Sequence, residues 1–81
     1  MTDYSITKLD ISKRNLTQLP DDIDKYTNLK ILHCLYNQLT NLDNLPPNLQ
    51  RLDCSGNPLT YDFEPNLENI RNYNVSRKQS S

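Results

Sequence analysis

An apolar pattern recurs along this chain at intervals of about twenty residues, and it limits the possible folds more than any other feature of the sequence. Each copy has an apolar residue, a second one three positions later and a third two positions after that. Copies begin at residues 6, 29 and 49, and a degenerate copy begins at residue 67, so the units are 23, 20 and 18 residues long. Tandem units of this length predict a repeat protein in which each unit stacks on its neighbours.

The spacing of two positions inside each copy predicts a short strand, because side chains two residues apart point to the same face. The inward pairs of three parallel strands are expected to be Leu9/Ile11, Leu32/Cys34 and Leu52/Cys54. Ile70 with Asn72 would make a poor fourth strand. One such unit is too small to bury its own apolar face, so the units must share one continuous core.

Asn37 and Asn57 follow the second and third expected strands at matching positions. A side-chain amide has two donors and one acceptor, so it can satisfy backbone groups that leave the sheet at the bend. This structural role is favoured over a catalytic one. The first unit has Arg14 in the same slot, and a guanidinium cannot accept a hydrogen bond. We expect this edge unit to tolerate it because one of its sides is open to water.

The motif Leu-x-x-Leu-x-Cys-x-x-Asn-x-Leu at 29–39 and 49–59 resembles the leucine-rich repeat family, and the resemblance covers residues 6 to about 75. The short cysteine-containing units are most similar to repeats of some bacterial effectors and large amoebal viruses. The resemblance implies an α/β solenoid, a short right-handed coil with a small parallel β-sheet on its concave face. It also implies irregular, 3₁₀ or short helical segments on the convex side, a ladder of stacked asparagines, and protein binding without catalysis.

The chain is short enough for one domain only, which we expect over residues 1–75 with a disordered tail over 76–81. Residues 20–26 are predicted to make one or two helical turns, since Ile23 and Tyr26 share a helix face. The prolines of the later units favour extended segments or single 3₁₀ turns. Neither end of the stack has an obvious cap, so the chain is either a complete small repeat protein or a fragment of a longer array.

Composition excludes several classes of function. Gly56 is the one glycine, so there is neither a glycine-rich phosphate loop nor a dinucleotide fingerprint. The net charge of −1 is too small to draw the chain to nucleic acid or to a membrane surface. We therefore expect no enzyme activity, no cofactor, no bound metal, no nucleic-acid partner and no membrane contact. The sequence has neither a signal-peptide pattern nor a long apolar run, which predicts a cytoplasmic, intracellular location.

The residues that carry chemistry favour structural roles. Cys34 and Cys54 occupy equivalent inward slots and are expected to be buried thiols, although the spacing of adjacent strands also permits a disulfide. His33 is adjacent to Cys34 and so points to the opposite face, which argues against a shared metal site. Asp10 and Asp53 should flank His33 across the strands, as a row of complementary charges rather than a catalytic group.

The outward face of the second unit is the best candidate for partner contact. Ile31, Leu35 and Tyr36 are apolar or amphipathic in slots that face water, whereas the neighbouring units are polar there. An apolar centre with a charged rim is typical of a small protein interface. Strand propensity, folding of Leu35 and Tyr36 over the end of the sheet, and sequence drift remain alternative explanations. The expected partner-binding residues are Ile31, His33, Leu35, Tyr36, Asp10, Arg51, Asp53, Arg71 and Tyr73.

The predicted function is therefore a protein-protein interaction module that binds its partner through the concave strand face. Four such strands would cover only about 300 Å², whereas a standard interface takes about 800 Å² from each partner. Weak or transient binding is expected from this face alone. The alternative is a structural or assembly piece that self-associates through the open edges of the solenoid.

Overall fold

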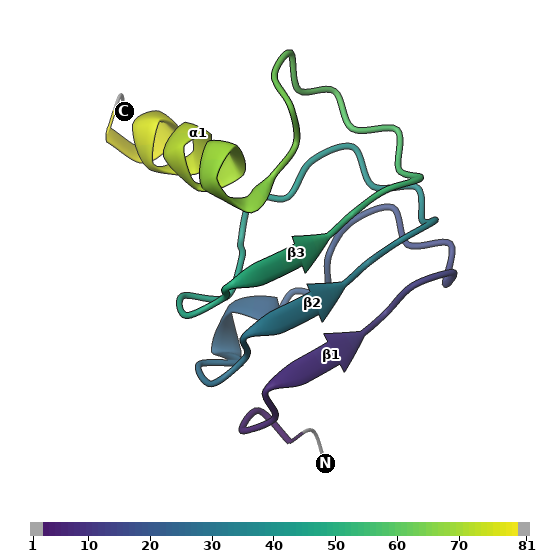
Figure 1. The fold of residues 1–81 in the computed structure, drawn as a ribbon, viewed down its shortest axis with the longest axis vertical. Coiled ribbons are helices and arrows are strands. Elements are labelled where there is room, and N and C mark those ends of the chain that lie inside the picture. The colour runs from purple at the N-terminus through teal and green to yellow at the C-terminus, as the bar shows by residue number, and fades with distance from the viewer. Residues whose placement is uncertain (1–2, 80–81) are drawn as a thin grey trace.

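Three short strands form one open parallel sheet in the computed structural model, which describes residues 3–79 (Figure 1). They are β1 (Lys8–Asp10), β2 (Ile31–His33) and β3 (Arg51–Asp53), in the spatial order β1-β2-β3. Their register aligns Leu9, Leu32 and Leu52 in one column. The predicted strands and the stacking of the first three units are confirmed, and the arrangement is solenoid-like.

The core lies between the sheet and the loops that return to start the next strand. In the second unit Leu29, Leu32 and Leu39 are fully buried. Leu9 and Leu52 are only partly buried, since each stands in an end unit with a neighbouring strand on one side only. Burial of a leucine side chain contributes about 1.5–3 kcal/mol, so the middle unit contributes most to the apolar stabilisation.

The first unit carries the predicted helical turn, a 3₁₀ helix at Ile23–Lys25 (η1). Ile23 is fully buried and Tyr26 nearly so, which is the shared face that their spacing predicts. Tyr4 covers this end of the core. Its ring meets the Tyr26 ring edge-on with a centroid distance of 4.9 Å, and its hydroxyl donates to Asp22 Oδ2 at 2.7 Å.

The two asparagines connect adjacent units as expected. Asn37 Oδ1 accepts hydrogen bonds from the Arg14 N–H at 2.9 Å and the Leu16 N–H at 3.2 Å, while Nδ2 donates to Ile11 O at 3.0 Å. Asn57 Oδ1 accepts from the Asn37 N–H at 3.1 Å in the same way. Each amide thus serves the unit before its own. The described sheet has no unit before the first one. An asparagine in the slot of Arg14 would therefore have no preceding backbone groups to bond, and Arg14 can occupy this slot without loss.

The fourth unit does not form the expected strand. Residues Leu67–Gln79 form an α-helix, α1, and Ile70 is fully buried from this helix. The helix begins after Asn66, whose Oδ1 accepts the Asn69 N–H at 2.8 Å as an N-cap. The spacing of the apolar residues explains why a fourth strand was expected. Leu67 and Ile70 are three positions apart, which suits a repeat motif and one helix face equally. The helix buries Ile70 fully and Leu67 partly, and it avoids a strand that lacks a good inward pair.

The helix also extends further than the sequence suggested. It runs through residues 76–79, where we expected a disordered tail, and residues 80–81 lie outside the described part of the chain. Arginine, lysine and glutamine at 77–79 all have high helix propensity, so this segment can continue the helix.

Candidate interaction surface on the strand face

The strand register aligns the outward side chains in two rows. Lys8, Ile31 and Arg51 form one row, and Asp10, His33 and Asp53 form the next. Leu35 and Tyr36 follow directly after β2. We call the outward side chains of the three strands and the turns that follow them the strand face.

Two of the predicted partner-binding residues lie elsewhere. Arg71 and Tyr73 belong to α1, because the fourth strand that would have placed them on the strand face does not form. The Arg71 guanidinium donates to the backbone oxygen of Pro46 at 3.1 Å. The Tyr73 ring packs against Tyr61 and Phe63, with centroid distances of 5.4 and 5.6 Å. Their placement on the strand face was therefore wrong.

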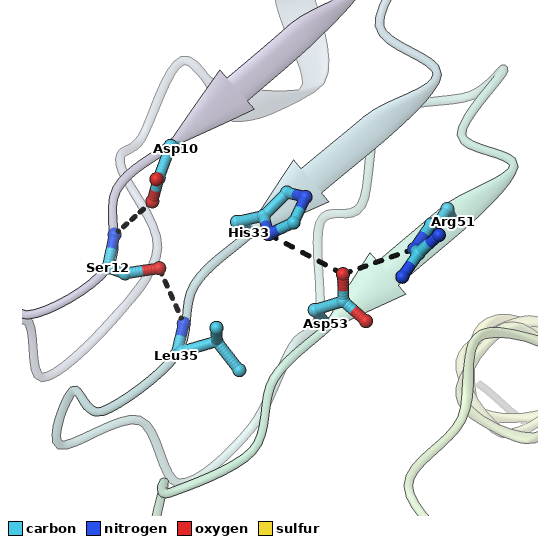
Figure 2. Close-up of polar contacts among 6 residues, drawn as sticks. All are labelled: Asp10, Ser12, His33, Leu35, Arg51 and Asp53. Atoms are coloured by element: carbon cyan, nitrogen blue, oxygen red, sulfur yellow. Dashed lines mark hydrogen bonds and ion pairs between the residues drawn. The ribbon is translucent and has the colours of Figure 1, made fainter.

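Asp53 contacts two neighbouring side chains of the strand face, whereas Asp10 bonds to its own turn (Figure 2). Asp53 Oδ2 lies 3.5 Å from His33 Nδ1 and 3.2 Å from Arg51 Nε. Asp10 turns the other way and accepts the Ser12 N–H at 3.0 Å, and this hydrogen bond lowers the pKa of the Asp10 carboxyl. Exposed pairs of this kind contribute little to stability. The His33–Asp53 contact fits the predicted row of complementary charges, whereas Asp10 does not pair with His33.

Tyr36 is the most exposed large apolar residue of the strand face, with 60% of its surface accessible. Its backbone has a φ of 55°, and Lys13 and Gly56 occupy the equivalent slots with φ of 58° and 78°. The Tyr36 ring lies against Gly56, where any Cβ atom would overlap ring atoms Cδ1 and Cε1. The ring therefore extends over the turn of the third unit, as one of the alternative explanations suggested, and yet stays exposed.

The turn after β1 adds residues that sequence reasoning left out of the site. Lys13 Nζ lies 5.8 Å from the centroid of the Tyr36 ring, and Ser12 Oγ accepts the Leu35 N–H at 3.0 Å. The repeat could have indicated Lys13, because residues 13, 36 and 56 occupy equivalent positions in neighbouring units. A shallow pocket at this end of the strands is lined by Asp10, Ser12, Lys13, Arg14, Leu35 and Tyr36. Its aliphatic wall, aromatic ring and flanking charges could seat a side chain of a partner.

The cysteines lie on the opposite side of the sheet, in the core. Both are free thiols, and burial raises the pKa of Cys34 to about 12 and also raises that of Cys54. Such thiols are poor nucleophiles, because the thiolate is the reactive form. Within residues 3–79 there is no cluster of three or more histidine, cysteine or acidic side chains placed to bind a metal ion. None of the helices described here combines the length and the apolar character needed to span a membrane.

The open parallel sheet, the repeated register and the asparagine ladder define a solenoid-like repeat protein. Residues 48–70 match the family model for the Leucine Rich Repeat. Comparison with curated proteins and with solved structures gave no match. Leucine-rich repeats are typically non-enzymatic modules that bind proteins.

Proposed function

We propose that this chain is a non-catalytic interaction module that binds a protein partner through the strand face, with Tyr36 at its centre. The observation that supports this most directly is that Tyr36 is largely exposed and yet packs against Gly56. Tyrosine is a favoured energetic anchor in interfaces. A ring that already packs against its own protein loses less conformational entropy on binding.

The surroundings of Tyr36 have the composition of a small interface. Leu35 is half-buried next to Tyr36, Ile31 is half-buried at the start of β2, and the charges of Asp10, Arg51 and Asp53 form a rim. Apolar centres with polar rims are common in protein interfaces. The buried free thiols of the core suit a reducing compartment, so we expect the partner to be intracellular.

The size of the strand face limits the affinity. The face has three strands instead of four. Counting about five residues for each strand with its turn, at about 3.3 Å per residue and about 4.8 Å between strands, it covers about 240 Å². A standard interface takes about 800 Å² from each partner. The strand face by itself therefore supports weak or transient binding, and tighter binding needs further contacts.

The test compares two variants that each change exposed apolar residues. Tyr36→Ala with Leu35→Ser alters the strand face, and Val75→Ser alters an exposed residue of α1. A partner captured by the wild-type chain is titrated against each variant by calorimetry, after circular dichroism shows that both are folded. We expect at least about tenfold weaker binding for the double variant, or about 1.4 kcal/mol, and no change for Val75→Ser. Equal affinity for all three chains would remove the strand face from the interface.

A further inference from the structure

The second and third units carry equivalent backbone N–H groups at the ends of their strands. Those of the second unit all donate hydrogen bonds to the third unit. In the second unit the N–H groups of Cys34 and Tyr36 donate to Asp53 O and Ser55 O, both at 2.9 Å. The Asn37 N–H donates to Asn57 Oδ1 at 3.1 Å. The third unit therefore supplies two carbonyls and one amide oxygen to the second.

The equivalent donors of the third unit are the N–H groups of Cys54, Gly56 and Asn57. Within residues 3–79, none of these three groups donates to a backbone or amide oxygen. The next unit is replaced by α1, which bonds to the loop of the second unit through Arg71 and Asn74 instead of pairing with β3. β3 is the last strand of the sheet, so its outer edge is unpaired there.

A groove lies before the start of β3, between residues 49–50 and the first turns of α1. Leu67 contributes apolar surface to it, and Gln50 and Arg71 contribute polar groups; Leu49 also lines the groove but is only 2% exposed. Leu52, the inward residue of β3, is also only partly buried, whereas its counterpart Leu32 is fully buried. Both the backbone donors and the apolar surface at this edge thus match the needs of one additional strand.

We propose that the β3 edge binds one extended segment of a protein partner, which runs parallel to β3 and adds a fourth strand to the sheet. Addition of a strand to an exposed edge is a general mode of peptide recognition, in which backbone hydrogen bonds give affinity and side-chain positions give specificity.

The strand register predicts which groups the bound segment needs at each position. Carbonyls level with Asp53 and Ser55 accept the Cys54 and Gly56 N–H groups, and an asparagine level with Asn57 accepts the Asn57 N–H. An aliphatic side chain level with Leu52 completes the core. Opposite charges stabilise cross-strand pairs and like charges destabilise them, so the segment carries an acidic residue beside Arg51 and a basic residue beside Asp53.

A second copy of this chain does not meet these requirements at its β1 edge. Equivalent stacking would place Lys8 beside Arg51 and Asp10 beside Asp53, which are two like-charge pairs. It would also place Arg14 in the asparagine slot, where a guanidinium cannot accept the Asn57 N–H. The charges and the ladder therefore favour a different polypeptide over head-to-tail self-association.

The probes are synthetic peptides based on residues 49–59, the segment that pairs with β2 in this structure. All carry C54A to remove the thiol. The first peptide also carries R51E and D53K, which makes it complementary to the edge. The second keeps the original charges, and the third adds N57A to the first. Each is titrated into the full chain, and the amide NMR shifts of Cys54, Gly56 and Asn57 are followed.

We expect the complementary peptide to bind about tenfold more tightly than the like-charged one, and the N57A peptide to bind more weakly than the complementary one. The protein variant carrying R51E and D53K should reverse the preference between the first two peptides. Absence of binding at millimolar peptide overturns the proposal. So do shifts confined to β1 and β2, or a preference that the charge-swapped protein leaves unchanged.

Discussion

Replacement of Asn37 by alanine tests the asparagine ladder, because this side chain is the one buried polar residue of the described core. Its amide bonds to the Arg14 N–H, the Leu16 N–H and Ile11 O at 2.9, 3.2 and 3.0 Å. A buried group that loses its partner costs about 1–3 kcal/mol. Since the two N–H groups are only partly buried, we use the lower value of about 1 kcal/mol for each of the three backbone groups and expect about 3 kcal/mol in total.

That loss is large for a chain of 81 residues, whose free energy of unfolding is expected to be about 4–12 kcal/mol. At about 4–8 °C per kcal/mol, the melting temperature should fall by about 12–24 °C. Thermal and urea unfolding followed by circular dichroism measure both quantities. Asn28→Ala changes an exposed asparagine in the first unit and should stay within about 0.5 kcal/mol of the wild type. Equal stability of the two variants would refute the reasoning.

Two further predictions concern Gly56 and Cys34. Gly56→Ala should cost at least about 1 kcal/mol because φ is 78°; it should cost less in a Tyr36→Ala background, since the ring that overlaps the new methyl group is then absent. Equal costs would argue against the Tyr36 contact. For Cys34, the folded pKa of about 12 lies above the unfolded value. Its contribution to stability is present below pH 9 and declines as the pH rises toward 12; Cys34→Ala should weaken this decline in urea unfolding.

Because α1 forms where the sequence predicted a fourth strand, both candidate surfaces differ from the expected ones. It removes Arg71 and Tyr73 from the strand face, which leaves a smaller contact area centred on Tyr36. It also leaves the β3 edge unpaired, with a groove before the start of β3. The two surfaces lie on the same three-stranded sheet, so one partner could use both and gain the area that the strand face lacks.

The first three units could be read from the sequence because their signals are local and repeated. The two-residue spacing of Leu32 and Cys34 fixes which side chains point inward, and the same spacing in neighbouring units fixes the register. Asn37 and Asn57 were predictable for a similar reason, since a buried amide at a bend must satisfy backbone groups. The row of Asp10, His33 and Asp53 followed directly from that register.

The course of the chain after residue 66 was decided by the tertiary structure. Leu67 and Ile70 fit a strand motif and a helix face equally, and the outcome depends on which arrangement covers the end of the core. The contacts of Arg71 and Asn74 with the second unit exist only once the helix is in place. The position of the Tyr36 ring over Gly56 is likewise a contact between units, which spacing alone does not specify. Periodicity determines which side chains share a column, whereas packing at the end of a stack depends on atoms that are distant in the sequence.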